Sequence, residues 1–576
     1  MKSVRHGNFA ALASSLLVLL AAFGAQGQTT SVGCTGTPCL KPSLGQVEAL
    51  FWKIEQLYPQ YFSPAAATQT QQFGSDTAHY RSYGNAYSAG LATYQGGLWY
   101  ALAGSWVRYS TLDEGNRDFC NGACWTSGPV VPGAFRGNIV LGSPTATSIR
   151  ANVFSADQRG AVYVAYGTSP GIYDKQTAPA TLEAGKPLEL ALEGLAGNTR
   201  HYYRLHFQAG DGTGSGPTEE YTFHTARPAG STFTFAIQGD SHPERAKTQF
   251  NADLYRRTLL TAAADSPDFY MTLGDDFSVD TLDPATIDAA KVTERYTIQR
   301  PYLGLVGRSA PVFLVNGNHE QAARYLLDGT PNNVAVWAQN ARNAHYSQPA
   351  PNGFYTGNTE SIPFIGPLRN YYAWTWGDAL FVTIDPYWGS PVAIDNIFGG
   401  SAKRPNLWDI THGDIQYQWL KTTLEQSQAK YKFVFAHHVM GTQRGGIELA
   451  GQYEWGGQNG NGSWGFTTNR PGWASPIHQL MAANHVTIFF QGHDHIWVRQ
   501  QLDGITYQTL SEPADPNYSL FNADAYHTGD MFPNTGYTRV TVAPTGVRVD
   551  YVRTYLPEDE GPGKASGAAV FSYTIP

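Results

Sequence analysis

The chain of 576 residues contains little charge, little cysteine and no long hydrophobic run beyond its N-terminus. Charged residues make up 15% of the sequence, whereas an average globular protein has about 25%. The net charge is −8 and no basic tract is present, which excludes binding to a nucleic-acid backbone by charge. Glycine (61 residues) and aromatic residues (13%) are plentiful, so the composition excludes disorder and favours several β-rich, loop-rich domains.

The N-terminus has the pattern of a secretory signal peptide. Lys2 and Arg5 precede an apolar run over residues 9–23, which is too short to span a bilayer comfortably. Ala25-Gln26-Gly27 then offers small residues at the −3 and −1 positions of a cleavage site. We therefore expect residues 1–27 to be removed and the mature protein to be periplasmic or secreted, with no membrane span.

The four cysteines form two close pairs in the sequence, Cys34 with Cys39 and Cys120 with Cys124. In an oxidising compartment this spacing favours two small disulfide loops, one of three possible pairings. A zinc knuckle is an alternative, but no histidine lies near either pair at ligand spacing. A lipid anchor on Cys34 is a further alternative, although Ser31-Val32-Gly33-Cys34 is a poor lipidation motif placed well past the apolar run.

The chain divides into a small N-terminal module, a β-sandwich and a larger C-terminal domain. Residues 28–136 combine a helical pattern with short aromatic strands, and we expect the aromatic residues to form a packed core rather than a glycan-binding surface. Residues 137–228 contain regularly spaced strand-length runs, which predict the sandwich. The segment around residues 195–204 resembles the E–F corner of a fibronectin type III domain, with His201 at the position where that family carries a tyrosine.

Residues 231–576 alternate strand and helix patterns, which predicts an α/β layered core. The expected strands cover residues 232–238, 268–273, 311–316, 380–384, 432–436 and 486–491. The expected helices cover residues 249–264, 287–305 and 414–428.

Polar side chains follow five of these strands. The blocks are Gly239-Asp240-Ser241-His242, Gly274-Asp275-Asp276, Gly317-Asn318-His319-Glu320, His437-His438 and Gly492-His493-Asp494-His495. One Gly-Asp pair alone is a common turn, and one histidine alone is more often structural than a ligand. Because ligands of open α/β sheets bind beyond the carboxyl ends of the strands, five such blocks in order favour one shared site.

The five blocks resemble the ordered motifs of the calcineurin-like metallophosphoesterase superfamily. The preceding sandwich, Glu320, the stretch at residues 371–385 and Gln418-Trp419-Leu420 are similar to its purple acid phosphatase branch. The resemblance implies a core of two mixed β-sheets flanked by helices and the hydrolysis of phosphoric esters at a pair of metal ions. Ser278 stands where purple acid phosphatases carry the tyrosinate that gives their colour, so we expect a colourless centre.

The resemblance also implies a ligand set. One metal ion would be held by Asp240, His242, Asp275 and His495, and the other by Asp275, Asn318, His437 and His493. A shared carboxylate at Asp275 would offset the repulsion between two cations, with iron, zinc or manganese as the expected metals. His319 would be catalytic, stabilising the phosphoryl group and protonating the leaving oxygen.

Several neighbouring residues are secondary candidates. Alternation along a strand places only one of the two adjacent histidines toward the metals, and the family pattern favours His437 over His438. Asp276 and Asp494 are candidates for turn residues or for carboxylates that support an imidazole N–H.

Three long insertions at residues 321–370, 386–413 and 441–473 follow the strand ends, so we expect them to surround the site. Within or beside them, arginines are candidates for binding phosphate, although solvent-exposed surface is their more common fate: Arg324, Arg342, Arg369 and Arg444. The sequence thus predicts an exported phosphatase that acts on small phosphate monoesters. The alternatives are a phosphodiesterase or nucleotidase on the same site, and a secreted binding protein without catalysis; the oligomeric state stays open.

Overall fold

The computed structural model forms two compact units, Met1–Arg136 and Gly137–Pro576. In the second unit the structure describes all residues except 211, 213–214, 247, 395–405 and 441–442. In the first it describes residues 47, 50–51, 54–55, 62, 68–73, 76–83, 89–94, 97–102, 105–111 and 135–136. The predicted signal peptide and all four cysteines lie outside the described residues. Over the part that is described, no helix has the length and apolar character needed to cross a membrane.

The first unit contains a five-stranded antiparallel sheet in sequential order. Its strands are β1 (Gln69–Phe73), β2 (Asp76–Ser82), β3 (Gly90–Tyr94), β4 (Gly97–Leu102) and β5 (Ser105–Thr111). Helical residues Leu50, Phe51 and Ile54 pack with Tyr83 and Leu91 in one buried cluster. The aromatic side chains of Phe51 and Tyr83 are therefore part of a packed core, as predicted from the sequence.

The second unit begins with two antiparallel sheets over the predicted sandwich. One sheet contains β11 (Leu188–Glu193), β7 (Ser148–Phe154) and β6 (Asn138–Gly142). The other contains β8 (Gly160–Gly167), β9 (Lys175–Gln176), β10 (Ala180–Leu182), β12 (Arg200–Ala209), β13 (Ser215–Pro217) and β14 (Tyr221–His224). At the predicted corner, His201 Nε2 lies 3.1 Å from the Ala196 carbonyl oxygen, so the imidazole N–H donates a hydrogen bond within the corner.

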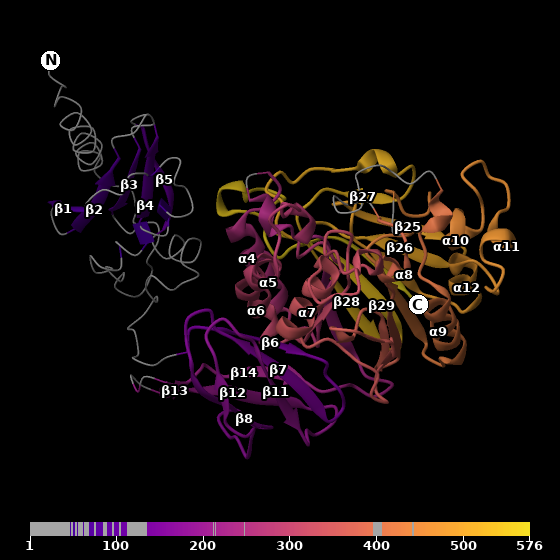
Figure 1. Cartoon of the computed structure of the whole chain (residues 1–576), viewed down its shortest axis with the longest axis horizontal. Helices are drawn as coiled ribbons and strands as arrows, with labels where there is room; N and C mark the ends of the chain where they lie inside the picture. The colour runs from indigo at the N-terminus through magenta and orange to yellow at the C-terminus, as the bar shows by residue number, and fades with distance from the viewer. Residues whose placement is uncertain are drawn as a thin grey trace. The chain divides into compact units, whose positions relative to one another are not determined.

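Two mixed sheets form the centre of the remaining chain (Figure 1). The first, in spatial order, contains β17 (Val312–Leu314), β16 (Tyr270–Thr272), β15 (Phe233–Gln238), β28 (Gly536–Ala543), β29 (Gly546–Arg553) and β30 (Ala569–Ile575). The second contains β18 (Thr356–Gly357), β21 (Tyr372–Trp376), β22 (Ala379–Thr383), β23 (Tyr431–Phe435), β24 (Ile488–Gln491), β26 (Ile505–Thr509), β25 (Trp497–Leu502) and β27 (Asp530–Phe532). Strands β15, β16 and β17 are parallel to one another, and so are β22, β23, β24 and β26.

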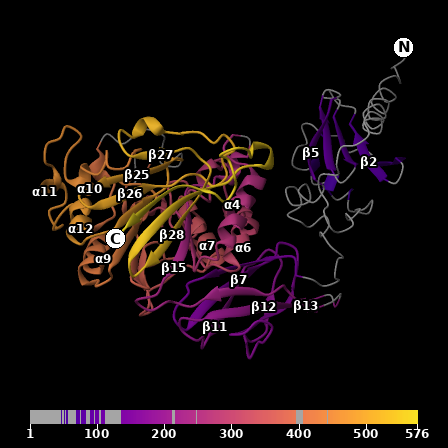
Figure 2. The same cartoon turned by 180° about the vertical axis from the view of Figure 1, so that it is seen from behind.

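The sheets face each other across an aromatic core, with helices on both outer faces (Figures 1 and 2). Phe235 of β15 packs against Phe381, Phe433 and Phe490 of the other sheet. The outer face of the first sheet packs against α4 (Ala252–Ala264), α5 (Ala289–Ile298), α6 (Arg300–Gly307) and α7 (Val334–His345). The outer face of the second packs against α9 (Asp414–Gln426), α10 (Tyr453–Gly456), α11 (Phe466–Asn469) and α12 (Ile477–Ala483). This is the α/β layered core that the sequence predicted.

Two features differ from the sequence-based expectation. The helix predicted over residues 287–305 is split into α5 and α6, because Pro301 has no N–H and begins a new helix instead of continuing the old one. The two sheets agree with the expectation, and the five polar blocks follow strands of both, whose ends meet. The insertions are not plain loops, since the first contains α7 and the strands β19 (Ser361–Ile362) and β20 (Gly366–Pro367).

The other short helices are α8 (Pro386–Gly389), η1 (Pro243–Arg245), η2 (Val279–Thr281), η3 (Arg324–Leu326), η5 (Leu407–Asp409), η6 (Ala523–Ala525) and η7 (Pro557–Asp559).

Candidate metal centre

Glycines let the strand-end loops approach one another closely. A Cβ atom on Gly492 would lie 2.5 Å from Asp240 Oδ1, and one on Gly317 would lie 2.1 Å from Asp275 Oδ1. Any other residue at these two positions would collide with a carboxylate of the site. The glycines in the blocks after β17 and β24 therefore make room for the acidic residues that follow β15 and β16.

Asp240 lies at the centre of one group of donor atoms. Its Oδ2 is 2.9 Å from Nε2 of His495 and 3.7 Å from Nε2 of His242. Its Oδ1 accepts a 2.7 Å hydrogen bond from the backbone N–H of His493. All three side chains of this group are buried.

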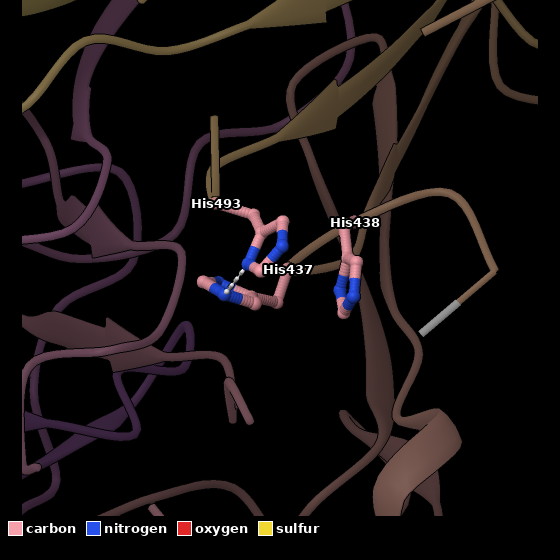
Figure 3. Close-up of side chains that lie close together, drawn as sticks. All are labelled: His437, His438 and His493. Carbon is pink, nitrogen blue, oxygen red and sulfur yellow. Dashed lines mark hydrogen bonds between the residues drawn. The ribbon is translucent and has the colours of Figure 1, made fainter. Parts of the chain in front are cut away.

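Asp275 lies at the centre of a second group. Its Oδ2 is 2.9 Å from Nε2 of His437 and 3.6 Å from Nε2 of His319, while its Oδ1 accepts a hydrogen bond from the backbone N–H of His319. His493 Nδ1 lies 3.2 Å from His437 Nε2, the contact drawn in Figure 3. Asn318 is buried between Gly317 and His319 on the same loop.

The residues present fit a metal centre. One set of donor atoms within 4.8 Å of one another comes from Asp240, Asp275, His437 and His493, and a second comes from Asp240, His242 and His495. His242 Nε2 is buried and has no hydrogen-bond partner among the described residues, although it faces Asp240. Sites that combine imidazole and carboxylate donors suit transition metals such as zinc, iron and manganese, whereas sites made only of oxygen donors suit magnesium and calcium.

The buried carboxylates and imidazoles of the centre shift one another's pKa values. Burial favours the neutral carboxyl of Asp240, but His437 and His495 outweigh burial and hold its pKa well below the ordinary value. Burial opposes the charged imidazole of His437, but Asp275 and Asp240 raise its pKa to about 9, so a cation that binds here displaces the proton of His437. Burial lowers the pKa of His493 well below its ordinary value, so this imidazole is neutral and available as a ligand.

Residues 233–497 match the family model of calcineurin-like phosphoesterases. The chain contains a calcineurin-like phosphoesterase domain. It is therefore a metal-dependent phosphoesterase, as the resemblance in the sequence predicted.

The chain is similar to several solved structures, of which the first supports a shared fold. Purple acid phosphatase PPD1 from seeds of yellow lupin (Lupinus luteus) is 14% identical, with 85% of this chain and 80% of that chain covered and a TM-score of 0.50. GAP50, the anchor in the inner membrane complex of Plasmodium, is 11% identical, with 60% and 88% covered and a TM-score of 0.34. Phosphopantetheinyl hydrolase from Mycobacterium tuberculosis is 14% identical, with 50% and 92% covered and a TM-score of 0.24. No curated protein matches the chain in sequence.

In the phosphoesterase domain, His438 does not turn away from the site as strand alternation predicted. Strand β23 ends at Phe435, so the alternation does not extend to residues 437 and 438. The ring of His438 stacks on that of His493 at 4.1 Å, and its donor atom belongs to a close set with His437 and His493 (Figure 3). Its Nδ1 lies 2.7 Å from the hydroxyl of Tyr387. His438 therefore lies beside the metal centre and supports His493.

Asp276 and Asp494, the candidates for turn residues or for imidazole supports, accept hydrogen bonds from groups other than imidazoles. Asp276 accepts a 2.6 Å hydrogen bond from the Ser241 hydroxyl, and Asp494 accepts hydrogen bonds from the Gly445 N–H and the Tyr526 hydroxyl. Three carboxylates that the sequence analysis did not select contact the histidines instead: Glu244, Asp280 and Glu512. Glu244 lies two residues after His242 and offered a local signal, whereas Glu512 follows β26 and offered none.

The arginine candidates fall into different environments. Arg342 is fully buried and donates to the carbonyl oxygens of Arg369 and Leu314. It is therefore neither solvent-exposed, which was the favoured expectation, nor placed to bind phosphate. Arg324 forms an exposed ion pair with Glu360.

Two other arginines lie at the edges of the metal centre. Arg444 donates to the His493 carbonyl oxygen and keeps more than a third of its side chain exposed. Arg245, which the sequence analysis did not select, places a guanidinium nitrogen 3.4 Å from Nε2 of His319.

Proposed function

We propose that the protein hydrolyses phosphate monoesters at a dimetal centre. The observation that carries the proposal is the convergence of buried carboxylates and imidazoles from five strand ends of two sheets. The residues that would hold the two cations are Asp240, His242, Asp275, Asn318, His437, His493 and His495. Cations held by these residues would supply positive charge to the phosphoryl oxygens and lower the pKa of a bound water.

His319 is the proposed proton donor. Its Nδ1 lies 2.7 Å from Asp280, which fixes the ring so that Nε2 faces Asp275 at 3.6 Å. Its side chain is 18% exposed, whereas the neighbouring ligand candidates are almost completely buried, so a substrate can reach it. An imidazole in this position can stabilise the phosphoryl group and give a proton to the leaving oxygen.

Positive charge at both edges of the centre favours a monoester over a diester. A monoester carries up to two negative charges and a diester carries one, so added cationic groups stabilise the monoester more. Arg245 lies on the His319 edge and Arg444 on the His493 edge. We infer that these two guanidinium groups contact the phosphoryl oxygens or an adjacent anionic group.

The metals that fit this proposal are iron, zinc or manganese without a tyrosinate ligand. Ser278 stands where the family's tyrosine would be, and its hydroxyl lies 3.3 Å from Nδ1 of His242. Because a serine hydroxyl at this position contacts His242 and no tyrosinate is present there, the centre should be colourless.

The deciding experiment compares an aryl phosphate monoester with a bis-aryl diester, using purified protein loaded in turn with zinc, manganese and iron. We expect faster turnover of the monoester, and we expect replacement of Arg444 by Ala to lower the ratio of monoester to diester rates. A diester rate above the monoester rate for every metal would replace the proposal with a phosphodiesterase. If neither substrate were turned over, the alternative of a binding protein without catalysis would replace the proposal.

We also propose that the protein is exported. Lys2, Arg5 and the apolar residues 9–23 support a cleaved signal peptide. N-terminal sequencing of protein from fractionated cells tests this, since mature chains should begin after Gly27. Full-length protein confined to the cytoplasmic fraction would contradict it.

A further inference from the structure

Two carboxylates lie behind the histidines on one side of the centre; Glu512 is buried, and the side chain of Glu244 is 8% exposed. Glu244 Oε1 is 3.0 Å from Nδ1 of His242, and Glu512 Oε1 is 2.9 Å from Nδ1 of His495. Both rings then turn Nε2 toward the same atom, Oδ2 of Asp240. The two histidines therefore share one arrangement, with a carboxylate on the outer nitrogen and Asp240 on the inner one.

On the opposite side of the centre the group nearest the outer nitrogen of His437 is neutral, and the Asp240 carboxylate, itself a proposed ligand, is farther away at 4.0 Å. Nδ1 of His437 lies 2.6 Å from the carbonyl oxygen of Leu273, and the ring of His493 stacks on His438. A carbonyl oxygen fixes the tautomer of an imidazole as a carboxylate does, but it brings no full negative charge.

Glu512 is itself held rigidly. Asn534 donates to Glu512 Oε2 at 3.2 Å, and the Asn534 side-chain oxygen accepts from the Glu512 backbone N–H at 3.0 Å. The same Asn534 amide donates to Asp515 at 3.1 Å. Both Glu512 and Asn534 are buried, so this contact is built into the interior rather than made by chance at the surface.

A carboxylate on the outer nitrogen of a ligating histidine fixes its tautomer and makes the inner nitrogen a stronger donor. We propose that Glu244 and Glu512 are positioning residues that make the two cation sites unequal. The site of Asp240, His242 and His495 retains its cation more tightly than the site of His437 and His493. This inference rests on the proposed dimetal centre.

The test measures release of Zn²⁺ from the loaded protein into an excess of a chromogenic chelator, which needs no activity. We expect two kinetic phases, one for each cation. Glu512→Gln places an amide N–H against His495 Nδ1 and reverses its tautomer. It should therefore accelerate the slow phase about 10–100-fold and leave the fast phase unchanged. Glu244→Gln should act on the same phase through His242.

Glu454→Gln is the matched control. Glu454 Oε1 lies 2.6 Å from Nδ1 of His412 in a similarly buried pair, and neither residue belongs to the sets of possible metal ligands. The substitution should change neither phase. Unchanged release in both Glu244→Gln and Glu512→Gln, or equal acceleration of both phases, would overturn the inference. A wild-type protein that binds no Zn²⁺ would instead overturn the dimetal centre itself.

Discussion

Glu320 provides a direct test of how the metal-centre loops are held together. Its carboxylate accepts four backbone hydrogen bonds: from Asp275 at 3.1 Å, Asp276 at 2.8 Å, Phe277 at 3.1 Å and Gly317 at 2.5 Å. Three of the donors belong to the loop after β16 and one to the loop after β17. Glu320 is buried, so water does not compete for these donors in the native protein.

Replacement of Glu320 by Ala leaves the four donors without their acceptor. A buried donor without a partner costs about 1–3 kcal/mol. If water satisfied two of the four, the remaining two would lower the free energy of unfolding by about 2–6 kcal/mol. Glu320→Gln should cost less, because its amide oxygen still accepts from one pair of N–H groups while its NH₂ faces the other.

Urea unfolding of the metal-free variants, followed by tryptophan fluorescence, measures this effect without contribution from metal binding. Glu360→Ala is the control, since its ion pair with Arg324 is exposed and worth at most about 1 kcal/mol. A loss of less than about 1 kcal/mol in Glu320→Ala would refute the idea that this carboxylate ties the loops together.

Other predictions concern catalysis and packing. Asp275→Asn should reduce monoester turnover at least 100-fold and lower the bound metal measured by elemental analysis; a loss below tenfold would contradict its role between the cations. His319→Gln should lower kcat about 10²–10⁴-fold with the metal content unchanged, whereas lost metal would make it a structural residue. Removing metal with a chelator should abolish turnover and lower the thermal midpoint, and added Zn²⁺ or Mn²⁺ should restore both; activity that survives complete removal would refute metal dependence. Glu454→Ala leaves His412 and Arg470 without their buried partner and should destabilise the protein by about 3–5 kcal/mol in urea unfolding, while a change within 0.5 kcal/mol would show that this pair does not anchor the insertions.

The strands and the polar blocks were predictable because both follow from short-range sequence patterns. β15 alternates large side chains toward the inner core with Ala236 toward the helices, and Gly239 and Asp240 follow directly. Each block follows the carboxyl end of a strand, where ligands of open α/β sheets bind, so the blocks favoured one shared site although their strands belong to two sheets.

The rest depends on long-range contacts that no local pattern records. Glu512 contacts His495 only because β26 returns beside β24, and the sequence around Glu512 contains nothing to mark it. Arg342 resembled a phosphate ligand, yet α7 turns it inward to the carbonyl oxygen of Leu314. His438 was misplaced because strand alternation was extended beyond the end of β23.

Backbone strain and buried charge at the centre have one common explanation. His242, Asp275, His493 and His495 have φ values of 44°, 58°, 67° and 54°, a left-handed conformation that non-glycine residues rarely adopt and that costs about 1–3 kcal/mol each. The same small volume holds several buried carboxylates in a chain that has only 15% charged residues. The neighbouring imidazoles compensate part of this negative charge, since Asp275 and Asp240 raise the pKa of His437 to about 9. The hydrogen bonds that Glu320 accepts hold the loops in the strained conformation. Cations held between Asp240 and Asp275 would offset the buried negative charge, so the conformation that brings the ligands together is stabilised by what they bind.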